Sequence, residues 1–84
     1  MRESTKKGDN VEVIEKTIGQ RIKELREARG LSQEKFGKRV GVTQQYVGAL
    51  ESGKRNPGPA LVFMIAKKFG TSEAWIKEGK EKTP

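Results

Sequence analysis

Apolar residues recur at helical spacing in five separate stretches of this chain. In the first stretch Ile18, Ile22 and Leu25 stand at positions i, i+4 and i+7, which places them on one face of a helix. The apolar positions of the later stretches are Phe36 and Val40; Tyr46, Val47 and Leu50; Val62, Ile65, Ala66 and Phe69; and Trp75 and Ile76. No stretch alternates with period two, so the pattern predicts an all-α fold of five short helices.

Cap residues and glycines predict where these helices begin and end. Residues suited to helix N-termini are Thr17, Ser32, Thr43 and Ser72, with Pro59 at the first position of the fourth helix. Glycines that can stop the five helices are Gly30, Gly41, Gly53, Gly70 and Gly79. We therefore expect a folded domain over residues 17–79, a flexible N-terminal arm over residues 1–16 and a C-terminal tail over residues 80–84.

The composition narrows the possible functions. The chain has 84 residues, with 18 Lys+Arg against 11 Asp+Glu, and its formal charge of +7 favours an acidic partner such as nucleic acid or an anionic membrane surface. Cysteine and histidine are absent and Asp9 is the only aspartate, so no catalytic or metal-binding set of residues is visible. We expect no enzymatic activity, metal, cofactor or small-molecule ligand.

The hydropathy pattern argues against a membrane protein. The longest apolar run, residues 60–66, is too short to cross a bilayer. The N-terminal segment MRESTKKGDN lacks the apolar region of a signal peptide. The mixture of Lys and Glu also argues against a peptide that binds a membrane surface. We therefore expect a cytoplasmic protein.

The second and third predicted helices are joined by a turn of three residues, 41–43. Gly41 can adopt the positive φ that such a tight turn needs. Gly37, four residues earlier, would let the two helices cross closely, and Val47, six residues after Gly41, would fill the angle between them. The joint spacing of these residues predicts a helix-turn-helix.

Three segments, IKELREARGLSQEKFG, YVGALESGKRNP and SEAWIKEG, resemble the phage-repressor and Cro family of DNA-binding domains, also called Xre-like regulators. The resemblance covers residues 18–79, about three quarters of the chain. VTQQ is particularly similar to the start of the recognition helix in some lambdoid phage repressors. The resemblance implies a five-helix domain that binds double-stranded DNA sequence-specifically and regulates transcription, as a repressor and a homodimer.

The resemblance also implies roles for particular residues. The third helix would enter the major groove, where the carboxamides of Gln44 and Gln45 can each pair with N7 and N6 of adenine, and Ala49 could touch a thymine methyl. Phosphate contacts would come from Gln33, Thr43, Lys54, Arg55 and Asn56. Gln33 would also brace Gln44. In similar proteins the positions of Arg26 and Glu51 form a partly buried ion pair between the first and third helices.

These assignments have plainer alternatives. Gln44 and Gln45 could form a solvated polar face, and Lys54 and Arg55 could belong to a solvated turn. One turn further along the reading face, Gly48 and Ala49 offer no side-chain donor, so specificity would depend on DNA shape. Gly48 also lowers helix propensity by about 1 kcal/mol relative to Ala, which suggests a close approach of backbone there.

The fourth predicted helix, ALVFMIA, is apolar nearly all round, which leaves part of it without an obvious place in the core. The residues left over are Leu61, Phe63 and Met64. We expect a homodimer interface formed by Leu61, Met64, Trp75 and Ile76, although Trp75 could equally be a core residue. The N-terminal Val11, Val13 and Ile14 could cover part of the same surface.

Other functions fit the same pattern. Toxin–antitoxin antitoxins and coactivator bridging factors use a similar fold, so a protein-interaction module is the alternative to a DNA-binding regulator. Some relatives carry a self-cleaving or dimerising region after this domain, and the ending KEKTP fits either a tail or a truncation. GALESGKR nearly matches a phosphate-binding loop, but Arg55 stands where that motif needs Ser or Thr, so we expect no nucleotide site.

Overall fold

The computed structural model describes residues 16–80 of the chain. Within them lie α2 (Ile18–Ala28), α3 (Gln33–Val40), α4 (Gln44–Ser52), α5 (Pro59–Phe69) and α6 (Glu73–Glu78), and no strand is present in this part of the chain. The predicted all-α fold with five helices is confirmed. The expected arm lies outside the described residues except for residue 16, and the expected tail except for residue 80. The proposed cover formed by Val11, Val13 and Ile14 also lies outside them.

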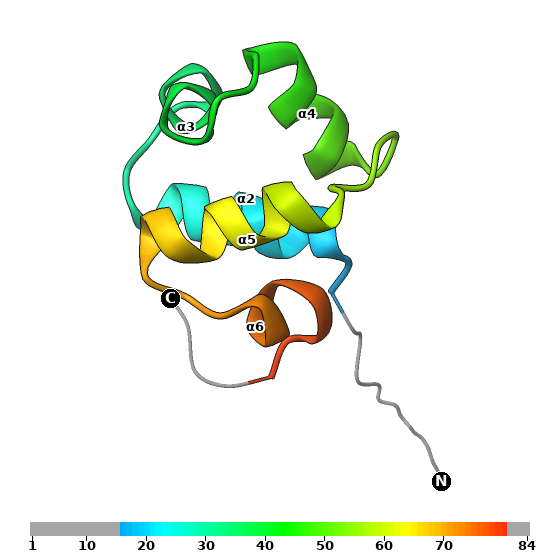
Figure 1. Ribbon diagram of the computed structural model, residues 1–84. Coiled ribbons are helices and arrows are strands. Elements are labelled where there is room, and N and C mark those ends of the chain that lie inside the picture. The colour runs from blue at the N-terminus through cyan, green and yellow to red at the C-terminus, as the bar shows by residue number, and fades with distance from the viewer. Residues whose placement is uncertain (1–15, 81–84) are drawn as a thin grey trace, which may run out of the picture.

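The five helices are stacked in three layers (Figure 1). Helices α3 and α4 form one outer layer, α2 and α5 form the middle layer, and α6 lies on the opposite side. Contacts run from α4 to α2 and α3, from α6 to α2 and α5, and from α3 to α5. This arrangement supports α3 and α4 from below and leaves their outer surface open.

The predicted cap residues agree with the helix boundaries. Four side-chain hydroxyls each accept a hydrogen bond from the backbone N–H three residues later, those of Thr17, Ser32, Thr43 and Ser72. Gly41 and Gly53, at the C-terminal ends of α3 and α4, have φ values of 82° and 85°. In that left-handed conformation a residue with a side chain would lower the stability of the fold by about 1–2 kcal/mol. Glycine therefore determines where these two helices end.

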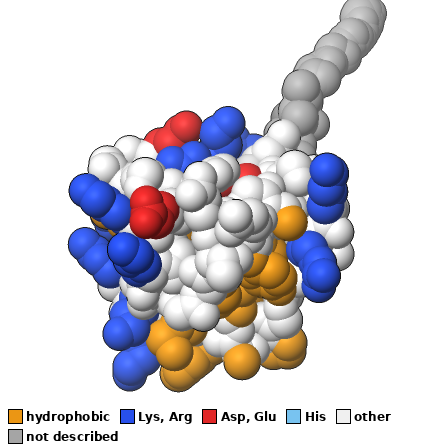
Figure 2. Space-filling model, turned by 90° about the horizontal axis from the view of Figure 1, so that it is seen from above, with side chains coloured by type: hydrophobic (Ala, Val, Ile, Leu, Met, Phe, Trp, Pro, Cys, Tyr) orange, Lys and Arg blue, Asp and Glu red, His pale blue; other side chains and the backbone are white. Residues whose placement is uncertain are grey.

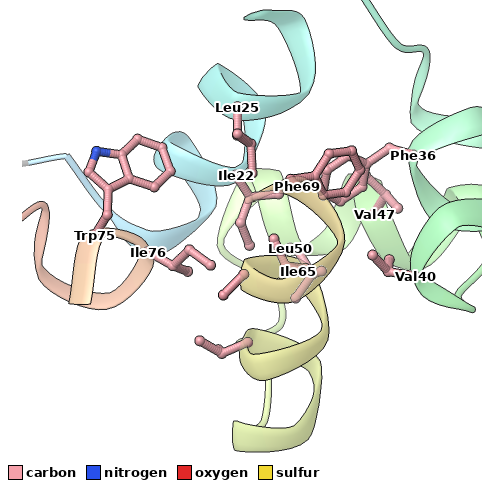
Figure 3. Packing of buried hydrophobic residues seen from close by; sticks show 12 residues of the cluster. Ile22, Leu25, Phe36, Val40, Val47, Leu50, Ile65, Phe69, Trp75 and Ile76 are labelled. Carbon is pink, nitrogen blue, oxygen red and sulfur yellow. The ribbon is translucent and has the colours of Figure 1, made fainter. Parts of the chain in front are cut away.

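One cluster of buried apolar side chains joins all five helices (Figure 3). Phe36 of α3 stacks on Phe69 of α5, with ring centroids 4.8 Å apart and an interplanar angle of 5°. Every apolar position assigned to an inward face by the periodicity is buried, except that Ile18 and Tyr46 are half-buried and pack against the edge of the cluster. The core therefore follows the helical spacing of the sequence.

Trp75 and Ile76 belong to this core, so the expectation that they form a dimer interface is wrong. Trp75 is 5% exposed and Ile76 is fully buried within the single chain. The physical reason is the size of α6, which has six residues and these two large apolar side chains to hold it against α2 and α5. Figure 3 shows both residues as part of the packed cluster.

Arg21 fastens α6 to α2, a role that the sequence analysis missed. It lies on the apolar stripe of α2 and is buried. Its guanidinium donates hydrogen bonds to the backbone oxygens of Lys16 at 2.6 Å, Ile76 at 2.7 Å and Lys77 at 2.6 Å. Two of these carbonyls belong to the last turn of α6, where the helix itself supplies no partner. Arg21 thus satisfies the end of α6 and holds that end in place.

Glycines allow close helix contacts around α4, but not all in the same way. A Cβ atom on Gly37 would collide with the carbonyl oxygen of Val42, which confirms the need for a small residue at the α3–α4 crossing. A Cβ atom on Gly19 would collide with the carbonyl oxygen of Leu50. A Cβ atom on Gly48 would meet only the Gln33 side chain, with its closest atom at 3.7 Å. The close backbone approach expected at Gly48 is therefore absent within residues 16–80.

We expect alanine to have opposite effects at Gly37 and Gly48. Gly37→Ala should lower the free energy of unfolding by about 1–3 kcal/mol, because the new methyl group overlaps backbone in a packed turn. Gly48→Ala should raise it by about 0.5–1 kcal/mol, because alanine favours the helix and has room there. Urea denaturation of both variants measures these changes. A Gly37→Ala protein as stable as the parent would contradict the close crossing of α3 and α4.

Candidate nucleic-acid interface

Helices α3 and α4 form the predicted helix-turn-helix. Residues 41–43 connect them, and the backbone N–H of Val42 bonds to the carbonyl oxygen of Gly37 at 2.9 Å, which closes the turn. Val47 is fully buried, as expected for the residue that fills the angle between the two helices. The first turns of α3 and α4 both begin next to solvent-exposed cap residues, Ser32 and Thr43.

The first turn of α4 carries the residues expected to read bases. Gln44 and Gln45 are the first two residues of the helix and both are exposed. The hydroxyl oxygen of Thr43 accepts a hydrogen bond from the backbone N–H of Tyr46 at 3.1 Å, which leaves the hydroxyl hydrogen available. Ala49 lies further along the helix and is half-buried. The exposed end of α4 therefore presents hydrogen-bond donors to solvent.

The predicted ion pair between Arg26 and Glu51 is present and reaches a third helix. Arg26 Nε and Nη2 donate to the two carboxylate oxygens of Glu51 at 2.7 and 3.1 Å, a bidentate arrangement. The two side chains are only 12% and 5% exposed. Gln33 Nε2 of α3 donates to the same carboxylate at 3.1 Å. A single carboxylate therefore connects α2, α3 and α4.

The position of Gln33 differs from the expectation that it braces Gln44. Its amide nitrogen is bound to Glu51, and because an ionised carboxylate can only accept, the nitrogen and not the oxygen must face Glu51. The carboxamide lies beside Gly48, whose lack of a side chain leaves space for it. Sequence reasoning could have noticed the helical glycine, but not which side chain from α3 lies against it.

Glu51 stabilises the charged form of Arg26. The hydrogen bond that Arg26 donates to Glu51 raises the pKa of Arg26 above its ordinary value, burial opposes this effect, and the negative charge of Glu51 adds to it. A raised pKa means that the stabilisation is present below that pKa and is lost only above it. Because arginine already titrates far above neutral pH, the Arg26 cation persists throughout the neutral pH range.

Lys and Arg side chains gather on two opposite edges of the α3–α4 face, around a largely uncharged centre (Figure 2). One edge lies on the side of the loop after α4, where Lys54, Arg55 and Asn56 are exposed. The Arg55 guanidinium lies 5.8 Å from the ring centroid of Tyr46, and its backbone N–H bonds to the carbonyl oxygen of Ala49 at 3.1 Å. Arg55 is therefore held against α4.

We expect Glu51→Gln to lower the free energy of unfolding by about 3 kcal/mol, because it leaves the shielded Arg26 cation without its counter-charge. The matched control is the exposed pair of Glu34 and Lys38, whose charged atoms are 3.6 Å apart. Glu34→Gln should change stability by less than about 1 kcal/mol. Chemical denaturation compares the two variants. Equal losses would show that Glu51 does not join the three helices.

Within residues 16–80 no helix is long and apolar enough to cross a membrane. The same residues contain no group of three acidic side chains placed to hold a metal ion.

Comparison with known proteins agrees with this geometry. The helix-turn-helix family matches residues 22–76 of the chain. The uncharacterized HTH-type transcriptional regulator y4dJ of Sinorhizobium fredii is 34% identical over 71 residues, which are 84% of this chain and 92% of that protein. YgzD of Bacillus subtilis, also an HTH-type transcriptional regulator, is 43% identical over 61 residues, 69% of this chain and 92% of that protein.

Among solved structures, the P22 c2 repressor protein in complex with synthetic operator 9T has a TM-score of 0.73 at 23% identity, covering 77% of this chain and 98% of that chain. This likeness shows a shared fold, that of a phage-repressor DNA-binding domain. Together with the match over residues 22–76 and the two curated relatives, it means that the chain belongs to the helix-turn-helix family of transcriptional regulators.

Proposed function

We propose that this protein represses transcription by binding double-stranded DNA sequence-specifically, with α4 in the major groove. The observation that carries the proposal is the exposed first turn of α4, with Gln44 and Gln45 side by side on the open face of a helix-turn-helix. A major groove is wide enough to admit one α-helix, and the layers below α4 leave that face unobstructed. The P22 c2 repressor, which shares the fold, is described in complex with a synthetic operator.

Gln44 and Gln45 supply the direct readout in this proposal. A glutamine carboxamide offers one acceptor and two donor hydrogens, which match N6 and N7 of adenine in the major groove. Beyond them Gly48 has no side chain, and Ala49 offers a methyl group that can pack against a thymine methyl. Because only two side chains carry hydrogen-bonding information, the remaining specificity depends on how easily the DNA adopts the bound shape.

Phosphate contacts would surround the reading helix. The Thr43 hydroxyl accepts a hydrogen bond from Tyr46, and one amide hydrogen of Gln33 is donated to Glu51. The hydroxyl hydrogen of Thr43 and the second amide hydrogen of Gln33 are left to donate to a phosphate. On the flank of α4 we assign phosphate contacts to Lys54, Arg55 and Asn56, which are exposed. Contacts of this kind fix the register of the protein on the duplex without reading its sequence.

A homodimer completes the proposal, because one helix-turn-helix covers one half-site and two half-sites lie about one DNA turn apart. With Trp75 and Ile76 inside the core, the surface available for dimerisation is on α5. Phe63 is 53% exposed and Met64 is 37% exposed, and Leu61 is half-buried beside them on the same helix. Adjacent large apolar side chains at this exposure fit the centre of an interface between two copies.

The alternative of an antitoxin or coactivator-like interaction module is not favoured, because the curated relatives are HTH-type transcriptional regulators. Their family is one of DNA-binding regulators, which is not typically enzymatic. We therefore propose double-stranded DNA and a second copy of the chain as partners, without a cofactor or small-molecule ligand. A regulator of this kind would act in the cytoplasm, where the chromosome is.

We expect Gln44→Ala to weaken binding to the selected site by about 1–3 kcal/mol and to relax one base position, because it removes a bidentate contact to that base. Selection of bound duplexes from a random pool, for the parent and the variant, identifies the position. Binding to unrelated DNA should stay unchanged and serves as the control. An unaltered site with unaltered affinity would remove Gln44 from the base readers and would weaken the proposed mode of binding.

We expect Met64→Glu combined with Phe63→Glu to shift the protein from dimer to monomer, because each change places a charge in an apolar contact. Lys23→Glu, at an exposed position of α2, changes the charge without touching this surface and serves as the control. Sedimentation with and without selected DNA measures the state. A double variant that assembles like the parent would place the interface elsewhere, and a parent that stays monomeric on its site would exclude the dimer.

A further inference from the structure

Five exposed basic residues lie on the flank of α4 opposite to Lys54 and Arg55. They form what we call the lateral basic surface, which consists of Lys35, Lys38 and Arg39 of α3 and Lys67 and Lys68 of α5. The two helices pack directly against each other. Figure 2 shows Lys and Arg side chains gathered along the edge of the molecule on the side where α3 and the end of α5 lie in Figure 1.

The lateral basic surface lies next to Phe69, a residue of the core that is close to two arginines. The Arg39 guanidinium lies 5.9 Å from the ring centroid of Phe69. Arg29, at the end of α2, donates a hydrogen bond to the carbonyl oxygen of the same residue at 2.6 Å. Next to this point Lys35, Lys38 and Arg39 line a shallow depression of about 280 Å³ together with the apolar Leu31. The three cations of α3 therefore border one concave area, while Lys67 lines a separate depression together with Phe63 and Glu73.

Few carboxylates offset this charge. Within the described residues, the ion pair that involves the surface joins Lys38 to Glu34, at 3.6 Å and with both side chains largely exposed. The other members have no carboxylate within 4.0 Å among residues 16–80. Counted with Glu34 and with Glu73, which lines the same depression as Lys67, the five cations leave a local excess of about three positive charges. Such an excess on one edge attracts an anionic partner.

Helix dipoles account for part of this surface but not for all of it. Lys38 and Arg39 lie in the last turn of α3, and Lys67 and Lys68 lie in the last turn of α5, where the helix dipole favours cations. Lys35 is the third residue of α3 and therefore lies in its first turn, where the dipole disfavours a positive charge. The dipole of α3 therefore does not account for the placement of Lys35.

We propose that the lateral basic surface binds the sugar–phosphate backbone of the DNA outside the groove that α4 enters. The inference rests on the proposed function, because it requires α4 to hold the duplex against the α3–α4 face. Lys54 and Arg55 would then contact the DNA backbone on one side of α4, and the lateral basic surface would contact it on the other side. Phosphate contacts do not depend on base sequence. These additional contacts therefore lengthen the bound segment of DNA without increasing the number of bases that the protein recognises. Affinity therefore depends on the length of the duplex beyond the selected site.

The test compares two duplexes that share the selected site, one ending at its borders and one extended by about one helical turn on each side. The variant carries Lys35→Gln, Lys38→Gln, Lys67→Gln and Lys68→Gln. The parent should bind the long duplex more tightly than the short one, and the variant should bind both alike. On the long duplex the plot of log K against log salt should flatten by about one unit for each lysine that contacts a phosphate.

The chain offers a control with the same change of charge. Lys16, Lys23, Lys77 and Lys80 are exposed lysines outside the lateral basic surface, and their replacement by Gln should preserve the preference for the long duplex. If both quadruple variants lost the preference for the long duplex to the same extent, the effect would be one of net charge and the proposal would be overturned. A lateral variant that keeps the length preference and salt slope of the parent would overturn it too.

Two further measurements separate the possible failures. The double variant Lys54→Gln, Arg55→Gln should weaken binding to the short and the long duplex alike. If this double variant loses affinity while the variant of the lateral basic surface does not, the lateral contact is rejected and the proposed function still stands. A parent protein that binds no duplex would reject both the lateral contact and the proposed function.

Lys35→Gln alone should raise the melting temperature slightly, because it removes an unfavourable charge from the first turn of α3, while it weakens binding to the long duplex. A loss of both stability and binding would assign Lys35 a structural role instead.

Discussion

The arrangement of the helix-turn-helix depends on one carboxylate. Glu51 lies near the end of α4, accepts a bidentate pair of hydrogen bonds from Arg26 of α2 and a third from Gln33 of α3, and is almost completely shielded from water. Charges that are withdrawn from water stabilise a fold only when they are paired with good geometry. Here the pairing is achieved only when all three helices are in place, so the carboxylate selects one mutual position of α2, α3 and α4.

That selection matters for the proposed function, because a helix that reads bases must be held rigidly. Base readout requires side chains to be held close to their productive geometry, and elements locked by packing do this better than mobile loops. The turn between α3 and α4 leaves no space for a side chain at Gly37, and α2 approaches α4 so closely that Gly19 also has none. Sterically closed contacts on two sides and a shared charge therefore fix α4 before any DNA is bound.

Local signals in the sequence were sufficient for the helices, whereas long-range partners were not readable from it. Hydroxyl caps, stop glycines and the proline at the first position of α5 act within one helical turn, so they predicted the helix boundaries of residues 16–80 closely. A buried apolar position, in contrast, carries no information about whether its cover comes from the same chain or from another, which is why Trp75 and Ile76 were misassigned to a dimer interface. Arg21 was missed because its acceptors on α6 lie 55 and 56 positions away in the sequence. The partner of Gln33 was missed for the same kind of reason, since Glu51 lies 18 positions further along.

The hydrogen bonds of Arg21 have a consequence for both ends of the described domain. One guanidinium holds the backbone of Lys16, just before α2, and the backbone of Lys77, in the last turn of α6. The two ends of the folded unit are therefore anchored next to each other, on the side of the molecule away from α3 and α4. One side chain therefore fixes the positions of both ends of the described domain, behind the helix-turn-helix.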